Sequence, residues 1–180
     1  SLLNKPYTAT STGSLVVIKE GNGNQVRQIM KVCSKEDNRI YERVYYSDAW
    51  GDWKKVFNGG SKILWSGGYY MTEGHKITLS EAISEQVSGI VLVFSRYADG
   101  QAQNYGFVSH FVSKEFVKAQ MGIGQCFLLC SSAKFGIMAC KYLYINDSTI
   151  TGHIDNSASG TANGITYNNS AYVLRYVIGV

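Results

Sequence analysis

Apolar residues along this chain fall in short runs or at alternating positions, which is the pattern of β-strands rather than of amphipathic helices. Near the N-terminus this pattern predicts strands over Ser14–Lys19, Val26–Val32 and Arg39–Tyr45. The first two flank Gly21–Asn24, whose Gly and Asn residues suit a tight hairpin turn.

The remainder of the chain is richer in short strands. Gly89–Phe94 is a continuous apolar run that fits a strand buried on both faces. Turn signals occur at Asp99-Gly100, Asn146-Asp147 and Asn163-Gly164. This spacing predicts an antiparallel β-sandwich or a jelly-roll-like barrel. The other strands expected in this part are Lys62–Trp65, His75–Leu79, Tyr105–Val112, Gln125–Cys130, Gly136–Ile145, Ser148–Gly152 and Ala171–Val180.

Two further segments break the pattern of strands. Ser113–Gln120 is the one helical candidate, with Ser113 as its N-cap. The polar stretch Asp155–Gly164 (DNSASGTANG) is expected to be a long loop.

The Gly59-Gly60-Ser61 break divides the chain into residues 1–60 and 61–180. The first part is expected to be a small β module and the second an antiparallel β-sandwich, so the predicted fold class is all-β. A module of about 60 residues buries little surface and is marginal alone. Trp50 and Trp53 are therefore expected to form its small core, and a sugar-stacking platform is the less favoured alternative.

The charge distribution argues against nucleic acid as a partner. The net charge is only +4, and no basic run or arginine-rich face is present. No apolar run approaches transmembrane length and no signal peptide is recognisable, so no membrane partner is expected. The chain begins SLLNKP, which suggests that it continues a longer protein.

The residues with metal or catalytic chemistry form no recognisable cluster. The four cysteines contain no CxxC pair and are expected to be free thiols, as in a reducing cytoplasm. His75 and His110 have no second ligand at metal spacing, so neither a metal nor a cofactor is predicted. No carboxylate pair stands out for glycoside hydrolysis, and a GxSxG elbow is missing, so no catalytic residues are assigned.

Two parts of the chain resemble phage tail proteins. Tyr41–Val56 resembles the knob-like modules of phage and pyocin tail fibres, in which an arginine-bearing strand precedes a W-x-x-W motif with basic residues at its end. The matching residues are Arg43, Trp50, Trp53 and Lys54. The C-terminal part is similar to head domains of receptor-binding proteins from siphophages of Gram-positive bacteria. That likeness is carried by residues 63–71, 76–84, 89–97, 141–147 and 164–180.

The resemblance implies a knob or shoulder module over residues 1–60 and a receptor-binding head over residues 61–180. It also implies a homotrimer at the distal tail or baseplate of a virion, made in the host cytoplasm. Its partners would be a host cell-wall glycopolymer, often wall teichoic acid, and other tail or baseplate proteins. A tail-borne polysaccharide depolymerase and a purely structural baseplate component remain alternatives.

The candidate saccharide contacts come from the residue types themselves. Tyr97–Tyr105 is a segment with an aromatic residue at each end and polar groups between, although an ordinary hairpin loop explains it equally well. His153 precedes the polar stretch, and loops held by a rigid sheet often carry binding residues. Sugars are held by aromatic stacking and by hydrogen bonds from planar polar groups. The candidate residues are Tyr97, Asp99, Gln101, Asn104, Tyr105, His153, Asp155 and Asn156.

Overall fold

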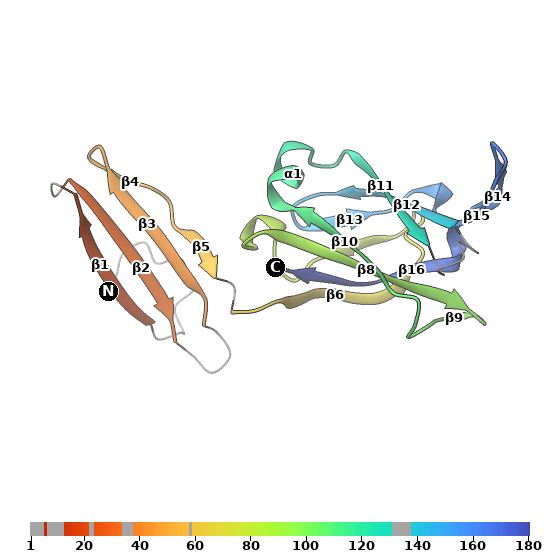
Figure 1. The fold of residues 1–180 in the computed structure, drawn as a ribbon, viewed down its shortest axis with the longest axis horizontal. Coiled ribbons are helices and arrows are strands. Elements are labelled where there is room, and N and C mark those ends of the chain that lie inside the picture. The colour runs from red at the N-terminus through yellow and green to blue at the C-terminus, as the bar shows by residue number, and fades with distance from the viewer. Residues whose placement is uncertain (1–5, 7–12, 22–23, 34–37, 58, 131–137) are drawn as a thin grey trace. The chain divides into compact units, whose positions relative to one another are not determined.

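The structure is a computed structural model that describes residues 6, 13–21, 24–33, 38–57, 59–130 and 138–180. The chain divides into two compact units, Ser1–Ser61 and Lys62–Val180. The break expected from the sequence falls one residue before this division. Both units consist almost entirely of β-strands, and each is described by itself (Figure 1).

Unit 1 is a five-stranded antiparallel sheet. Strand β1 pairs with β2, β2 pairs with β3, and β3 pairs with both β4 and β5. The three strands predicted from the sequence are confirmed to within one residue at each end. The strands are β1 (Gly13–Glu20), β2 (Gln25–Val32), β3 (Ile40–Tyr46), β4 (Ala49–Trp50) and β5 (Lys54–Phe57).

The two tryptophans of unit 1 have different roles. Trp53 packs against the small core of Met30, Val32 and Tyr41, as predicted. Trp50 is 40% exposed, so its assignment to the core is wrong. The guanidinium carbon of Arg43 lies 4.6 Å from the ring centroid of Trp50 and 4.5 Å from that of Trp53. The arginine therefore joins the exposed ring to the buried one by two cation–π contacts.

Unit 2 contains two sheets. The first has the order β10-β8-β16-β6, with β9 paired to β8. The second has the order β14-β15-β12-β13-β7, with β11 paired to β12. Strands of the first sheet are β6 (Lys62–Tyr69), β8 (Gly89–Ala98), β9 (Gln101–Ala102), β10 (Val108–Ser113) and β16 (Tyr172–Gly179). Those of the second are β7 (Lys76–Thr78), β11 (Gly124–Cys130), β12 (Met138–Ile145), β13 (Thr149–Thr151), β14 (Ser159–Ala162) and β15 (Ile165–Asn168).

The two sheets face each other and enclose one core, which confirms the predicted all-β, antiparallel sandwich (Figure 1). A single parallel pairing, Met138 with Tyr167, is the exception to the antiparallel pattern among the described strands. The fully buried side chains come from both layers, and burying each large one stabilises the fold by about 1.5–3 kcal/mol. They include Ile90, Leu92, Phe94, Leu129, Leu143, Ile145, Ile150 and Leu174.

The polar stretch after residue 154 is not the long loop that the sequence predicted. A short 3-10 helix, η2 (Ile154–Ser157), is followed by the hairpin of β14 and β15. Asn163 and Gly164 connect the hairpin strands with φ angles of 51° and 78°, which is the geometry of a type I′ turn. The hairpin was missed because β14 is polar and fully exposed and the four residues of β15 show no alternation of burial.

The predicted helix is confirmed as α1 (Lys114–Ala119). The Ser113 hydroxyl accepts a hydrogen bond from the Phe116 N–H at 3.1 Å, as expected of an N-cap. Strand β12 was predicted from Gly136, and residues 131–137 lie outside the described residues. Short 3-10 helices also occur at η1 (Ile83–Glu85) and η3 (Asn169–Ala171). Within the described ranges, no helix has both the length and the apolar character needed to cross a membrane.

The unequal roles of the two tryptophans give a first prediction. Trp53→Ala should destabilise unit 1 by about 2–3 kcal/mol, because it removes an aromatic ring from a small core. Trp50→Ala should cost less than about 1 kcal/mol, since the ring is largely exposed. Amide hydrogen exchange of β2 and β3 in the full chain measures both effects. Equal acceleration of exchange in the two variants would contradict this division of roles.

Candidate functional site

The two segments predicted to contact saccharide lie at the same end of unit 2 (Figure 1). The first is the hairpin at the end of β8 and the start of β9. The second is η2 with the residues before it, next to β12. The two segments do not line one common cavity. The second segment borders a cavity to which the first contributes no residue.

The hairpin displays most of its candidates to solvent. Asp99 and Gly100 have φ angles of 52° and 75°, so the predicted Asp-Gly turn is confirmed. Asp99 and Gln101 are exposed, and Tyr105 is 56% exposed. The Asn104 side-chain oxygen accepts a hydrogen bond from Arg175 at 3.4 Å. These residues form an accessible projecting surface rather than a pocket.

Tyr97 is less available than the other hairpin residues. Its hydroxyl donates to the Gly100 carbonyl oxygen at 2.7 Å, and its ring centroid lies 4.8 Å from that of Tyr70. Burial, together with a hydrogen bond to Tyr97, raises the pKa of Tyr70 to about 12. Tyr97 therefore holds the turn and the neighbouring strand end, which leaves Asp99, Gln101 and Tyr105 as the accessible candidates of the hairpin.

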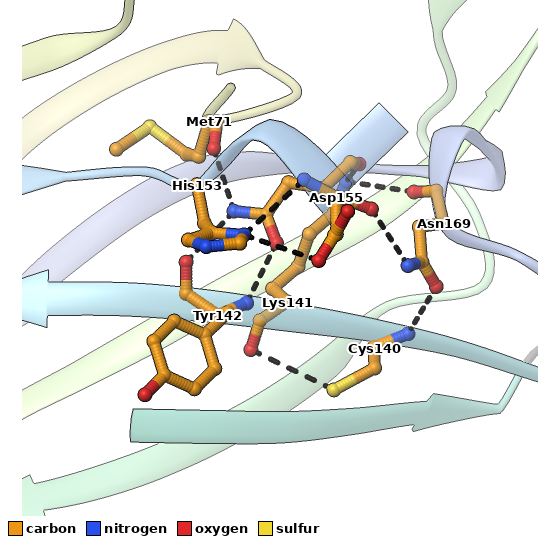
Figure 2. A network of polar contacts seen from close by, with 8 residues as sticks. Met71, Cys140, Lys141, Tyr142, His153, Asp155 and Asn169 are labelled. Atoms are coloured by element: carbon orange, nitrogen blue, oxygen red, sulfur yellow. Dashed lines mark hydrogen bonds and ion pairs between the residues drawn. The ribbon is translucent and has the colours of Figure 1, made fainter. Parts of the chain in front are cut away.

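The second segment borders a cavity of about 260 Å³ on the outer face of β12. Strand β12 alternates between outward and inward positions, and Cys140 and Tyr142 occupy outward ones. Helices η2 and η3 supply the remaining walls (Figure 2). The lining residues are Cys140, Tyr142, His153, Asp155, Asn156 and Asn169.

His153 connects the cavity wall to the start of η2. Its Nδ1 atom accepts a hydrogen bond from the Asp155 backbone N–H at 3.2 Å, so Nε2 is the ring nitrogen that residue 155 does not engage. The Asp155 carboxylate lies 3.4 Å from the same nitrogen and its side chain is 73% exposed. The His153 ring centroid is 5.1 Å from that of Tyr142, which is itself 5.5 Å from that of Tyr144. An exposed carboxylate thus stands beside three clustered aromatic rings.

Asn156 is not the exposed contact that the sequence predicted. Its side chain is buried, and its amide nitrogen donates to the carbonyl oxygens of Met71 at 2.6 Å and Tyr142 at 2.8 Å. Its side-chain oxygen accepts from the Tyr142 N–H at 2.7 Å. The side-chain amide of Asn156 thus pairs with backbone groups as a neighbouring strand would, and it links η2 to β12. The assignment of its side chain to saccharide contact is therefore wrong.

Asn169 has a similar structural role at the other wall. Its side-chain oxygen accepts from the Cys140 N–H and its amide nitrogen donates to the Asp155 carbonyl oxygen, both at 2.8 Å. The hydrogen bonds fix η2 and η3 against β12 (Figure 2). The two asparagines therefore shape the cavity rather than offer their amides to a ligand.

The sequence analysis missed Lys141, which lies beneath the cavity. Its side chain is completely buried at an inward position of β12. The ammonium donates to the backbone carbonyl oxygens of Tyr70 at 3.1 Å, Asn156 at 2.6 Å and Asn169 at 2.7 Å. One signal was present in the sequence, because Lys141 alternates in phase with the inward-facing Leu143 and Ile145.

Burial changes the pKa values of two neighbouring groups of β12, Lys141 beneath the cavity and Cys140 in its lining. Desolvation lowers the pKa of Lys141 to about 7. Burial also raises the pKa of the Cys140 thiol, with a further contribution from the Cys126 thiol across the strand pair. None of the four cysteines, all of which the structure describes, forms a disulfide.

The remaining histidines are engaged within the fold. His75 Nδ1 accepts a hydrogen bond from the Thr72 N–H at 3.1 Å, and His110 Nε2 lies 3.0 Å from the Leu128 carbonyl oxygen. Both have the structural roles that the sequence predicted. In the described part of the chain, no group of three His, Cys, Asp or Glu side chains is placed to hold a metal ion.

Comparison with known proteins adds no further assignment. No protein-family model matches the chain, and no curated protein sequence is significantly similar to it.

The buried lysine predicts how stability depends on pH. Between about pH 7 and 10.5 the unfolded chain binds more protons at Lys141 than the folded chain, because the folded-state pKa is lower. The free energy of unfolding should therefore rise from pH 7 to 9, by at most about 1.4 kcal/mol per pH unit. Above this window, Cys140 and Tyr70 should lower the free energy of unfolding as the pH rises. The reason is that their folded-state pKa values are raised, from an ordinary value of 9.0 for Cys140.

Urea unfolding at a series of pH values tests this prediction. Lys141→Met should lower stability, because three carbonyl oxygens lose their donor, and should also flatten the rise between pH 7 and 9. Lys76→Met, at an exposed position of β7, is the matched control and should keep the rise. A slope that persists in Lys141→Met would assign the pH dependence to another group.

Proposed function

We propose that this chain is a receptor-binding module of a phage tail, which attaches the virion to host cell-wall carbohydrate without catalysis. The carbohydrate is wall teichoic acid or another wall polysaccharide, and the place of action is the distal tail or baseplate. Two lines of evidence support the proposal: the resemblance of the sequence segments to tail-fibre and receptor-binding modules, and the cavity at the end of the sandwich. No nucleic acid, membrane or cofactor has a part in it.

The observation that carries the proposal is the grouping of Tyr142, His153 and Asp155 around one cavity. Aromatic rings stack against the C–H faces of sugar rings, and an exposed carboxylate accepts hydrogen bonds from hydroxyl groups. The rigid sheet and the two engaged asparagines hold these groups in fixed positions. A preorganised site of this kind binds without a large entropic cost of ordering.

The arrangement of carboxylates favours binding over hydrolysis. Glycosidases need two carboxyl groups facing the scissile bond, and Asp155 is the one carboxylate among the residues that line this cavity. A second cavity, of about 300 Å³, is bordered by Glu115 and Asp147. Both carboxylate oxygens of Asp147 accept hydrogen bonds from Ser84, at 2.7 and 2.8 Å, which makes Asp147 a cap of η1. Release of soluble sugar from purified cell walls by the protein would favour the depolymerase instead.

A homotrimer is part of the proposal. Strand β16 lies inside its sheet between β8 and β6, so burial within unit 2 explains its apolar residues. The outer face of that sheet offers a better argument. There Phe111, Val91, Ile178 and Ile63 lie opposite one another on four adjacent strands, and we call them the apolar row. Phe111 and Ile63 are 57% and 56% exposed. A continuous apolar row of this kind suits a contact between copies of the chain.

Multivalency raises the overall affinity of the proposed module for the cell wall. One small, open cavity binds a sugar unit weakly. Several copies on one virion raise the effective concentration at the cell wall, so that combined binding exceeds single-site binding by orders of magnitude.

Adsorption of the protein to host cell walls tests the site. His153→Ala combined with Asp155→Ala should reduce binding to walls by at least about tenfold, because contacts are lost at every copy. Asp99→Ala combined with Tyr105→Ala is the matched comparison at the same end of unit 2, and it should reduce binding less. Comparison of binding to intact walls and to walls stripped of teichoic acid shows whether teichoic acid is the polymer that is bound.

Each outcome of the adsorption assay is informative when the variants remain folded. If the His153 and Asp155 variant binds like the parent while the hairpin variant does not, the site lies on the hairpin. If the parent protein fails to label intact cells and walls, a structural baseplate role replaces the proposal.

Light scattering tests the oligomeric state. The parent should have the mass of a trimer at micromolar concentration, and Phe111→Asp should convert it to a monomer by placing a charge in the apolar row. Phe116→Asp, at a 47% exposed position on α1 outside the row, is the control and should stay trimeric. A monomeric parent protein would refute the homotrimer.

A further inference from the structure

The polar groups around the cavity differ sharply in what they can still bind. The side-chain amides of Asn156 and Asn169 are committed to Met71, Tyr142, Cys140 and Asp155 backbone atoms. The strongest group left for a ligand is the Asp155 carboxylate, whose side chain is 73% exposed. An ionised carboxylate only accepts hydrogen bonds. The ligand must therefore supply donors at this point.

The cavity offers few groups that could hold an anion. Its lining contains neither lysine nor arginine. Lys141 lies beneath it, but the ammonium directs its hydrogen bonds at the carbonyl oxygens of Tyr70, Asn156 and Asn169. Phosphate and carboxylate ligands are normally held by arginine, lysine or several N–H donors. Here His153 has one ring nitrogen left for a ligand, Nε2, because Nδ1 is engaged by residue 155.

Charge repulsion from Asp155 also disfavours an anionic ligand. Two unit negative charges about 4 Å apart repel by about 1 kcal/mol in water and by several times more at a partly buried surface. A phosphate or uronate group placed against Asp155 would meet this repulsion without a compensating donor. An uncharged sugar instead offers paired hydroxyl groups to the carboxylate and an apolar ring face to Tyr142.

From this inventory we infer that the cavity at Tyr142, His153 and Asp155 recognises an uncharged sugar unit through its hydroxyl donors, and that it rejects phosphate and carboxylate groups. The inference rests on the proposed function and narrows it. On an anionic wall polymer, the recognised part would be a neutral sugar rather than the charged backbone.

Saturation-transfer NMR on the full chain tests the inference with two sets of probes. The neutral set is methyl glucoside, methyl galactoside and N-acetylglucosamine, and the acidic set is glucuronic acid and glycerol 3-phosphate. At least one neutral probe should show transfer, and neither acidic probe should. Binding of the neutral probe should also depend little on salt, because no ion pair is formed.

Two variants of the same chemical change locate the site. Asp155→Asn keeps the shape of the side chain but removes its charge, and it should weaken the neutral probe about tenfold, since hydrogen bonds to charged groups contribute about 1.5–3 kcal/mol. Asp99→Asn makes the same change on the hairpin and tests that alternative position. Asp52→Asn, at an exposed position of unit 1, is the control and should leave binding unchanged.

The possible failures are distinguishable. Acidic probes that bind as tightly as neutral ones, or a neutral probe that binds Asp155→Asn as tightly as the parent, would overturn the inference. Loss of neutral-probe binding in Asp99→Asn alone would keep the proposed function but move its site to the hairpin. If no probe binds and the protein also fails to adsorb to walls, both the inference and the proposed function fail. Adsorption to walls without any neutral-probe binding would refute the inference alone.

Discussion

The end of unit 2 depends on one buried side chain, that of Lys141. Lys141 is completely removed from solvent, and its ammonium is satisfied by backbone carbonyl oxygens from the end of β6, from η2 and from η3. Desolvating an ammonium costs several kcal/mol, so it is tolerated only where hydrogen bonds replace its hydration shell. The three carbonyl oxygens in turn each accept a hydrogen bond from this one side chain. Each partner therefore requires the other, and the three segments are held to one point.

This constraint explains the form of the cavity above it. The loop segments that carry His153 and Asp155 are too short to fold independently. They are fixed because Asn156 and Asn169 contribute both side-chain amides and backbone carbonyls to the same network. The polar groups below the cavity are engaged in hydrogen bonds within the fold, whereas the Asp155 carboxylate at its rim is accessible to a ligand. The site is rigid for the same reason that its asparagines are unavailable to a ligand.

The sequence predicted the parts of the fold that depend on local pattern. Alternating strands such as β12, the turn at Asp99-Gly100 and the Ser113 cap follow from residue type and spacing. It did not predict the hairpin of β14 and β15, whose polar strands show no periodic burial. It also misplaced Asn156, because polar residues are usually exposed, and here distant backbone atoms of Met71 and Tyr142 satisfy the amide. Interactions between segments far apart in sequence decided those positions, and no local pattern records them.

The exposure of Asp155 has a consequence for how such a module can change over generations. Its carboxylate approaches His153 Nδ1 at 3.4 Å, but the hydrogen bonds of residue 155 in the network that supports η2 are made by its backbone. Exchanging the side chain therefore costs little stability. Natural variants can acquire a new binding preference at this position in a single step, while the lysine and the asparagines beneath it are held nearly invariant by folding. Among related proteins, amino-acid substitutions should be frequent at the rim of the cavity and rare at its floor.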